Sequence, residues 1–347
     1  MRTILVTGGA GFIGCNFIRY LLREHPDYSV CNLDKLTYAG NLENLRDLSG
    51  HPRYTFVQGD ICDAELANRL VKTADAVVNF AAETHVDRSL LDASPFITAN
   101  VLGTFVLLRA ASESRVKVFL HISTDEVYGE MPPGTSATET SPLKPRSPYA
   151  ASKAGADLQC LACFETYNLP VVIARPTNNV GPFQHPEKAV PLFTTNSLED
   201  KPLPIYGDGR QRRDWLYVED HCQALDVLLH RGQPGNIYNI GAGNERENIE
   251  VAQTILRLLG KPQSLIKHVE DRKGHDRRYS LDFTKIQALG WRPRHDFESA
   301  LASTVKWYQE NSDWWHKAKS GQFARYYEQQ YGRRLAGGNP GQGGKVS

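Results

Sequence analysis

The sequence predicts an α/β protein in which a doubly wound parallel sheet is joined to a smaller, loop-rich α/β domain. In the first half, short runs of β-branched and aromatic residues alternate with segments of helical periodicity. These runs are apolar at nearly every position, as expected for strands that helices cover on both faces. The alternation stops after Pro176, and 347 residues are enough for about two domains.

The expected elements follow one another as strand and helix from the N-terminus. The first strand is TILVTG (3–8), and the first helix covers 14–25, where apolar residues recur three and four positions apart. Further strands are expected at 28–34, 54–60, 74–82, 116–123 and 170–176, and further helices at 64–72, 100–114, 147–168, 248–260 and 297–311. We expect a sheet domain over 1–176 to which 212–240 return, a discontinuous second domain over 177–330, and a disordered Gly-rich tail over 336–347.

The bulk composition excludes several kinds of partner. A net charge of +1 and 23% charged residues give no sign of nucleic acid or of an anionic membrane. There is no signal-peptide pattern and no run of about 18 apolar residues, so we expect a cytoplasmic protein without a membrane partner. The six cysteines are scattered, and Cys160-x-x-Cys163 lies in a helical stretch, so we expect helix packing and no metal site.

A glycine loop between the first strand and the first helix predicts a dinucleotide site. Gly8, Gly11 and Gly14 form G-x-x-G-x-x-G, a pattern typical of the Rossmann sheet, which permits a tight turn and close approach of a pyrophosphate. The helix N-terminus that follows favours phosphate. Asp34 ends the second strand and can bind both ribose hydroxyls, which favours NAD over NADP. The alternative is a tight turn without a ligand.

Tyr149 and Lys153 form a second candidate site. The segment SPYAASK places them one helical turn apart on one face. A tyrosine hydroxyl has a pKa of about 10 and is a poor base at neutral pH, but a nearby ammonium and the nicotinamide of an oxidised cofactor favour the phenolate. The pair can then remove the proton of a substrate alcohol while hydride leaves its carbon. A surface lysine beside a half-buried tyrosine would show the same spacing.

Together these motifs resemble those of the extended short-chain dehydrogenase/reductases. Within that group, STDEVYG at 123–129 resembles the signature of the nucleotide-sugar 4,6-dehydratases. The resemblance covers about residues 1–330 and includes TGGAGFIG, LDKLTYAGN, AAETHVDRS, SPYAASK, RPTNNVGP, PIYGDGRQRRDWLYVED and DRKGHDRRY. Simple dehydrogenases need no adjacent carboxylates at this point, whereas a dehydratase does.

The resemblance implies a three-step reaction, with dTDP-D-glucose as the expected substrate. Hydride passes from C4 of the hexose to NAD⁺, water is lost across C5 and C6, and the hydride returns to C6. Motif matching makes Glu126 the base at C5, Asp125 the acid at the C6 hydroxyl, and Thr124 a partner of the C4 oxygen beside Tyr149. Asp125 must hold a proton near neutral pH, and burial and the Glu126 charge should both raise its pKa.

The resemblance also assigns ligand contacts along the chain. Arg213 and Arg272 are expected at the pyrophosphate, because a guanidinium binds phosphate oxygens in a bidentate manner. Contacts with NAD are expected from Gly8, Gly11, Phe12, Ile13, Gly14, Asp34, Lys35, Thr37, Asp60, Ile61, Ala81, Ala82, Asn100, Tyr149, Lys153 and Asn179. Contacts with the nucleotide sugar are expected from Thr84, His85, Asn178, Lys188, Ala189, Pro204, Tyr206, Arg213, Asn248, Arg272 and His275.

Some residues depart from the family pattern, and alternatives stay open. Val180, Ala189 and Lys273 stand where tyrosine, a larger aliphatic residue and proline are usual, so UDP-hexose or another NDP-hexose remains an alternative substrate. A nucleotide-sugar 4-epimerase would use the Tyr–Lys pair and NAD⁺ without the adjacent carboxylates. A non-catalytic NAD-binding protein is disfavoured by the intact set of residues. The family usually dimerises through a four-helix bundle that includes the Tyr–Lys helix, so we expect a homodimer.

Overall fold

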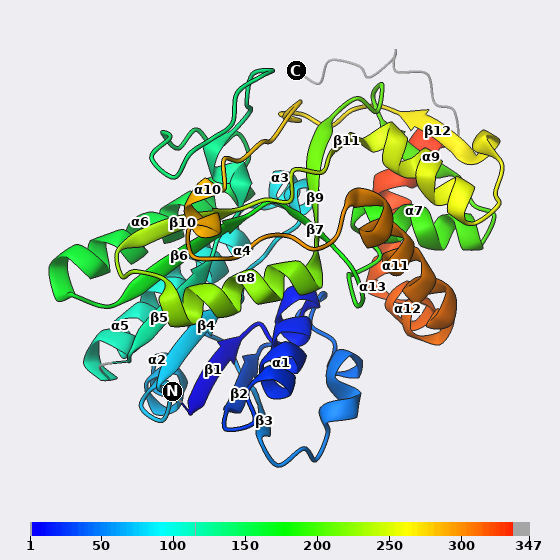
Figure 1. Cartoon of the computed structure of the whole chain (residues 1–347). Coiled ribbons are helices and arrows are strands. Elements are labelled where there is room, and N and C mark those ends of the chain that lie inside the picture. Colours follow the sequence, from blue (N-terminus) through cyan, green and yellow to red (C-terminus); the bar gives the residue numbers. More distant parts are fainter. Residues whose placement is uncertain (1, 115, 336–347) are drawn as a thin grey trace, which may run out of the picture. The chain divides into compact units, whose positions relative to one another are not determined.

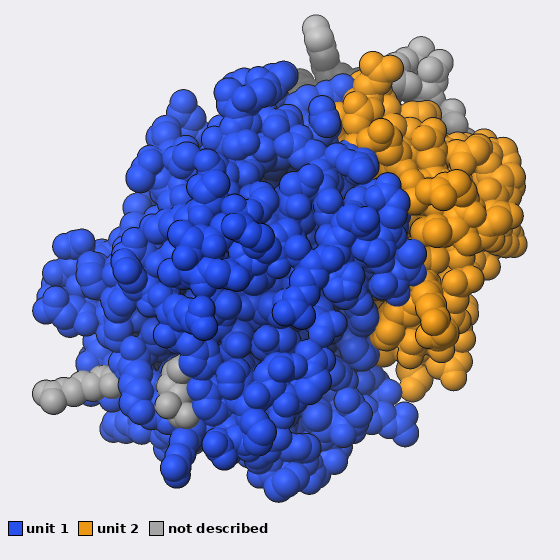
Figure 2. Space-filling model, in the orientation of Figure 1, with its two compact units in different colours: residues 1–184, 212–246, 276–304 blue, residues 185–211, 247–275, 305–347 orange. Residues whose placement is uncertain are grey.

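In the computed structural model the chain forms two compact units, and the structure describes residues 2–114 and 116–335. Unit 1 contains residues 1–184, 212–246 and 276–304, and unit 2 contains 185–211, 247–275 and 305–347 (Figure 2). The tail expected over 336–347 lies outside the described residues. Residues 276–304 cluster with unit 1, whereas the sequence prediction grouped them with the second domain. Two isolated β-bridges, from Arg278 to Arg212 and from Leu281 to Ala137, connect this segment to the rest of unit 1.

Unit 1 is built on a seven-stranded parallel sheet with the order β10-β6-β5-β4-β1-β2-β3 (Figure 1). Its strands are β1 (Thr3–Thr7), β2 (Ser29–Asp34), β3 (Tyr54–Gln58), β4 (Ala76–Asn79), β5 (Val118–Ile122), β6 (Val171–Pro176) and β10 (Asn236–Ile240). Leu5 of β1 pairs with Cys31 of β2 and with Val77 of β4. The strand order reverses at β1, so a ligand crevice is expected outside the carboxyl ends of β1 and β4. The predicted fold class is confirmed.

Helices cover both faces of this sheet, as its apolar strands require. The helical elements of unit 1 are α1 (Phe12–Glu24), η1 (Leu42–Leu48), α2 (Ala64–Val71), α3 (Val86–Leu91), α4 (Ser94–Phe96), η2 (Ile97–Gly103), α5 (Thr104–Ser114), η3 (Asp125–Tyr128), α6 (Pro148–Tyr167), α8 (Val218–Arg231) and α10 (Thr284–Gln287). On one face, α1 and α8 lie side by side and bury Phe17 and Leu225 against the sheet (Figure 1). On the other face, α2, α5 and α6 bury residues such as Leu107 and Cys160.

A small three-stranded sheet lies beyond the end of β6. It has the order β11-β9-β7 and is formed by β7 (Asn178–Val180), β9 (Arg212–Tyr217) and β11 (Glu245–Glu247). Asn179 of β7 pairs with Leu216 of β9. The strand β9 then leads directly into α8, so the residues after 212 return to the core of unit 1 and end in the edge strand β10.

The helix expected at 100–114 begins earlier and contains a wider turn. Residues Ile97–Gly103 form the π-helical turn η2 between α4 and α5. Asn100, inside this turn, donates to Ser152 Oγ (2.8 Å) and to the carbonyl of Glu83 (3.0 Å). By length and composition alone, the stretch Ser94–Ser114 is long and apolar enough to cross a membrane, and 44% of its apolar window is buried inside the fold.

Unit 2 combines a two-stranded parallel sheet with helices. The strand β8 (Leu203–Tyr206) pairs with β12 (Ile266–Val269), and Ile205 lies opposite His268. Its helical elements are α7 (Ala189–Leu198), α9 (Asn248–Leu258), η4 (Gln263–Leu265), α12 (Ser312–Ala318), α13 (Gln322–Tyr327), η5 (Glu328–Gly332) and α14 (Arg333–Leu335), while α11 (Phe297–Glu310) includes residues of both units. A reciprocal cap between Glu247 and Glu250 begins α9, the helix predicted at 248–260.

Candidate active site

The glycine loop ends in an uncapped helix N-terminus beside the sheet. Gly8 has φ +70°, and a Cβ on it would lie 2.6 Å from the backbone nitrogen of Ala81. A Cβ on Gly14 would lie 2.4 Å from the carbonyl oxygen of Gly8, so larger residues are excluded at both positions. The helix α1 begins after Gly11 without a side-chain cap and without an acidic residue in its first turn. Its first N–H groups therefore fit the pyrophosphate of a dinucleotide.

Asp34 lies at the end of β2, where the sequence predicted a ribose contact. One carboxylate oxygen accepts the N–H of Ala10 (2.9 Å), and the other accepts the N–H of Leu36 (2.8 Å). Burial raises the pKa of Asp34, and these two donors oppose that rise. Each oxygen retains acceptor capacity for a ribose hydroxyl. Lys35 and Asp60, two further predicted cofactor residues, form an ion pair at 2.7 Å.

Asp125 and Glu126 open the 3-10 turn η3 directly after β5. Thr124 caps this turn, because its hydroxyl accepts the N–H of Glu126 (3.3 Å) and donates to Asp125 Oδ1 (3.2 Å). The hydroxyl of Thr177 lies 3.1 Å from the other oxygen of Asp125, which is only 3% exposed. Burial and the charge of Glu126 raise the pKa of Asp125 to about 7. The raised pKa that the sequence predicted for Asp125 is confirmed.

Glu126 contacts Tyr279, a residue that the sequence analysis did not single out. The hydroxyl of Tyr279 lies 3.5 Å from Glu126 Oε2 and donates to Asp276 Oδ2 at 2.7 Å. The guanidinium of Arg213 lies 4.2 Å from the centre of the Tyr279 ring and donates to the carbonyl of Asp276. Arg213 is therefore buried beside η3, where its charge acts to lower the pKa of Asp125.

Tyr149 and Lys153 lie one turn apart on α6, and both are buried. Lys153 Nζ donates to the carbonyl of Ile122 (2.6 Å), and burial lowers the pKa of Lys153 to about 8. Burial, followed by the charge of Glu126, raises the pKa of Tyr149 well above its usual value, although a hydrogen bond with Thr124 opposes this. The lowered tyrosine pKa expected from the sequence depends on the charge of the oxidised nicotinamide as well as on Lys153, and it stays a prediction for the NAD-bound protein.

A buried ion pair supports the Tyr–Lys helix. Asp157, one turn after Lys153, accepts from Arg175 Nε (2.8 Å), and Arg175 donates to the hydroxyl of Tyr128 (2.8 Å). His121 Nε2 lies 3.7 Å from the other Asp157 oxygen, and burial lowers the pKa of His121 well below its usual value. Asp157 and Arg175 are at most 1% exposed, so removal of either partner would leave an unpaired buried charge. Because Tyr128 belongs to η3, these contacts join α6 to the turn that contains Asp125 and Glu126.

The other predicted residues of unit 1 lie on or next to the elements already described. The amide of Asn179 donates to the carbonyl of Thr177 (2.9 Å), and its oxygen lies 2.9 Å from His221 Nδ1. Ile61 is 5% exposed and belongs to the apolar core between sheet and helices. Phe12 and Ile13 begin α1, Thr37 follows β2, Ala81, Ala82, Thr84 and His85 lie between β4 and α3, and Asn178 begins β7.

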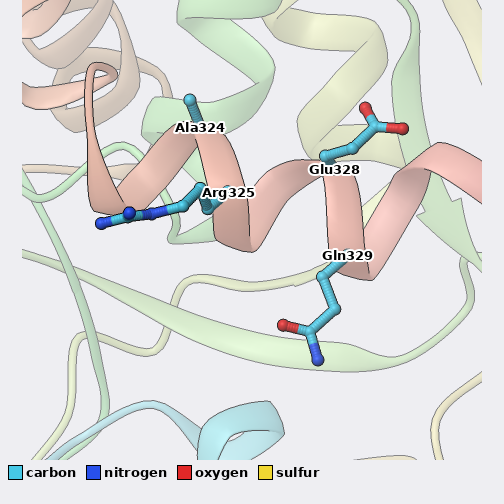
Figure 3. A pocket seen from close by; sticks show the side chains of 4 residues that line it. All are labelled: Ala324, Arg325, Glu328 and Gln329. Carbon is cyan, nitrogen blue, oxygen red and sulfur yellow. The ribbon is translucent and has the colours of Figure 1, made fainter.

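Seven predicted nucleotide-sugar residues lie in unit 2, namely Lys188, Ala189, Pro204, Tyr206, Asn248, Arg272 and His275. The rings of Tyr206 and His275 meet edge to face at 5.9 Å. Asp271 lies 2.6 Å from His275 Nδ1 and accepts from Gln211 (2.9 Å), so the segment around Arg272 is held against β8. A separate hollow of unit 2 is lined by Ala324, Arg325, Glu328 and Gln329 on α13 and η5 (Figure 3). It contains none of the predicted residues.

Comparisons with known proteins agree on one family. The family profile described as GDP-mannose 4,6 dehydratase matches residues 5–304. A dTDP-glucose 4,6-dehydratase of Streptomyces niveus is 52% identical over 322 residues, which cover 91% of this chain and 96% of that protein. A dTDP-glucose 4,6-dehydratase of Streptomyces venezuelae, crystallised with NAD bound, has a TM-score of 0.89 and 51% identity, covering 91% of this chain and 100% of that one. A UDP-glucose 4-epimerase of Thermotoga maritima covers 89% of this chain and 99% of its own at 30% identity, with a TM-score of 0.83.

The fold and the site define a nucleotide-sugar enzyme of the extended short-chain dehydrogenase/reductase type. The chain belongs to the nucleotide-sugar 4,6-dehydratase family. Within it, relatives about half identical to this chain over most of its length are named dTDP-glucose 4,6-dehydratase, whereas the epimerase is more distant. The resemblance predicted from the sequence motifs is therefore confirmed.

Proposed function

We propose that this chain is a hydro-lyase that converts dTDP-D-glucose into dTDP-4-keto-6-deoxy-D-glucose with NAD as its cofactor. The observation that carries the proposal is the pair Asp125–Glu126 on one turn, beside the hydrogen-bonded Thr124 and Tyr149. Loss of water requires an acid and a base near adjacent carbons. Asp125 holds its proton up to about pH 7 because it is buried next to the charge of Glu126.

The residues of the glycine loop and of the strand ends fit NAD. The uncapped start of α1 would hold the pyrophosphate, Asp34 a ribose, and Lys153 the nicotinamide ribose. NAD, when bound, supplies an acceptor for hydride from C4 and later the donor of hydride to C6. The closely packed Gly8 and Gly14 support this assignment, since side chains there would fill the loop.

Each catalytic residue then has one task. Thr124 and Tyr149 hold the C4 hydroxyl, and Tyr149 removes its proton as hydride leaves. Lys153, with a pKa of about 8, is charged at neutral pH and stabilises the Tyr149 phenolate that accepts this proton. Glu126 removes the C5 proton, which the neighbouring ketone has made acidic, and Asp125 gives its proton to the departing C6 hydroxyl.

The nucleotide end is assigned to basic and aromatic side chains. We place Arg213 and Arg272 at the diphosphate, in accordance with the affinity of guanidinium groups for phosphate. The adjoining rings of Tyr206 and His275 offer surfaces for the nucleoside. The relatives named for dTDP-glucose favour dTDP over the alternative NDP-hexoses that Val180, Ala189 and Lys273 leave open.

A homodimer is part of the proposal. Seven large hydrophobic side chains on the helical layer of α3, η2, α5 and α6 are between 43% and 66% exposed, namely Leu90, Leu91, Ile97, Leu102, Phe105, Leu158 and Tyr167. Pairing of these helices with those of a second copy would cover this apolar face and complete a four-helix bundle. A cytoplasmic location stays a prediction, and the free thiols of all six cysteines agree with a reducing compartment.

The substrate is tested by incubating the purified protein separately with dTDP-, UDP-, GDP- and CDP-glucose. The proposal expects a 4-keto-6-deoxy product that forms fastest from dTDP-glucose. A 4-epimeric sugar with no ketone would favour the epimerase alternative. A faster reaction with UDP-glucose would change the nucleotide assigned to the substrate but would keep the assigned reaction.

A further inference from the structure

A cluster of two histidines and one carboxylate lies away from the residues of the proposed chemistry. His25 follows α1, while Asp226 and His230 lie one turn apart on α8. His25 Nε2 lies 2.8 Å from Asp226 Oδ1, and His230 Nδ1 lies 3.2 Å from the same oxygen. One candidate ligand atom from each of the three residues lies within 4.8 Å of the others. None of them contributes to the dehydratase mechanism.

From this arrangement we infer that His25, Asp226 and His230 form a binding site for a divalent transition-metal ion such as Zn²⁺. Two imidazole nitrogens and one carboxylate oxygen are a common ligand set for zinc, with water in the fourth position. Bonds of about 2.0–2.2 Å place neighbouring ligand atoms of a tetrahedral site roughly 3.3–3.5 Å apart. The observed separations need only small movements to reach that spacing.

The surrounding residues hold the two histidine rings in place. The hydroxyl of Tyr28 lies 2.7 Å from His230 Nε2, the kind of outer contact that orients a metal-bound imidazole. The ring of His25 stacks on Tyr28 at 4.4 Å and on His230 at 5.1 Å. Arg53 donates to the carbonyls of His25 and Tyr28, each at 2.9 Å, and so anchors the loop after α1.

The cluster is open enough for an ion to enter. The three side chains are between 19% and 31% exposed. An ion would replace the contact between His230 Nδ1 and the carbonyl of Asp226 (2.8 Å). A bound ion would cross-link the end of α1 to α8, two helices that lie side by side on one face of the sheet (Figure 1).

Protons and the metal compete for the same nitrogens. Binding should therefore tighten as the pH rises from about 6 to about 8, because imidazole binds a metal only in its neutral form.

The test uses the full chain with NAD, freed of metal by a chelator and titrated with Zn²⁺. Calorimetry should show one ion per chain, and Zn²⁺ should raise the melting temperature. His25→Gln and His230→Gln should weaken binding at least tenfold and remove the thermal shift, whereas His268→Gln, in β12 of unit 2, should keep both. Turnover should not change in any of the variants.

Each protein is compared with itself with and without Zn²⁺, so a loss of stability caused by the substitution does not imitate the result. Equal zinc affinity and equal thermal shift in the wild type and in both cluster variants would overturn the site. The absence of binding to the wild type would also overturn it and leave the cluster as a hydrogen-bonded ion pair.

Discussion

At the scale of single residues, two adjacent carboxyl groups differ because their surroundings differ. Asp125 is 3% exposed, and both of its oxygens lie within hydrogen-bonding distance of threonine hydroxyls. Glu126 instead contacts Tyr279 at 3.5 Å, and its charge contributes to the raised pKa of Asp125. One turn can therefore present a protonated acid and a charged base to adjacent carbons of one sugar.

Glu126→Gln should separate oxidation at C4 from the loss of water. The amide cannot remove the C5 proton, so the 4-keto-6-deoxy product should form about two to four orders of magnitude more slowly. Oxidation at C4 should persist, and absorbance of reduced nicotinamide should accumulate after substrate is mixed with the variant. Product formation at the wild-type rate would remove Glu126 from its assigned role.

Tyr149→Phe is the matched control for an earlier step. The ring is kept but the group that accepts the C4 proton is lost, so neither reduced nicotinamide nor product should appear. Rapid-mixing absorbance measurements on both variants distinguish the two steps. A Tyr149→Phe protein with full activity would contradict the assignment.

Asp125→Asn should reduce activity and yet stabilise the chain at alkaline pH. The folded-state pKa of Asp125, about 7, lies above the unfolded value, so protonation stabilises the fold and that stability is lost as the pH rises through about 7. The amide stays neutral, so the melting temperature of the variant relative to wild type should rise between about pH 4 and about pH 7 and stay constant above that. Wild-type dehydration should decline above about pH 7. A pH-independent difference between the melting temperatures would show that Asp125 titrates normally.

At the scale of elements, the contacts from α6 through β6 to η3 couple the two halves of the site. Asp157 on α6 binds Arg175 on β6, and Arg175 binds Tyr128 on η3. The charge of Asp157 also acts to raise the pKa of the buried Lys153. The same carboxylate thus joins the elements and keeps the ammonium charged.

Asp157→Asn should destabilise the fold by about 3–5 kcal/mol, because Arg175 stays buried without its partner. It should also shift the alkaline limit of C4 oxidation to lower pH, because Lys153 loses a neighbouring negative charge. The double variant Asp157→Asn/Arg175→Met should recover part of the stability but keep the shifted pH profile. If the double variant recovered both its stability and the wild-type pH profile, the Asp157–Arg175 ion pair would have only a structural role.

The elements that could be predicted are those whose signal is local. The strands β1 to β6 are short runs rich in β-branched, aliphatic and aromatic residues, and the glycine loop and the Tyr–Lys pair have fixed spacings. The edge strand β10 has the sequence NIYNI, a run of only five residues that two asparagines interrupt, and it was not identified as a separate strand. Tyr279 lies 153 residues from Glu126, and no local pattern reports such a contact. The burial of Asp157 and Arg175 likewise depends on tertiary packing.

At the scale of the whole molecule, the exposed apolar side chains of the α5–α6 layer predict a homodimer. Leu158→Glu, in which a carboxylate replaces a 57% exposed leucine on α6, should shift the protein toward the mass of one chain in analytical ultracentrifugation. Leu258→Glu, on α9 of unit 2 and 39% exposed, is the control and should leave the dimer intact. A wild-type protein that sediments as a monomer at high concentration would contradict the prediction.

The most direct test of the central claim follows one hydrogen atom through the reaction. The purified protein is given dTDP-glucose that carries deuterium at C4, in ordinary water and without added cofactor. The account predicts a 4-keto-6-deoxy product with deuterium at C6, because the hydride removed in the first step returns in the last. Deuterium that remains at C4 of an epimer, or that is missing from C6 of the product, would contradict it.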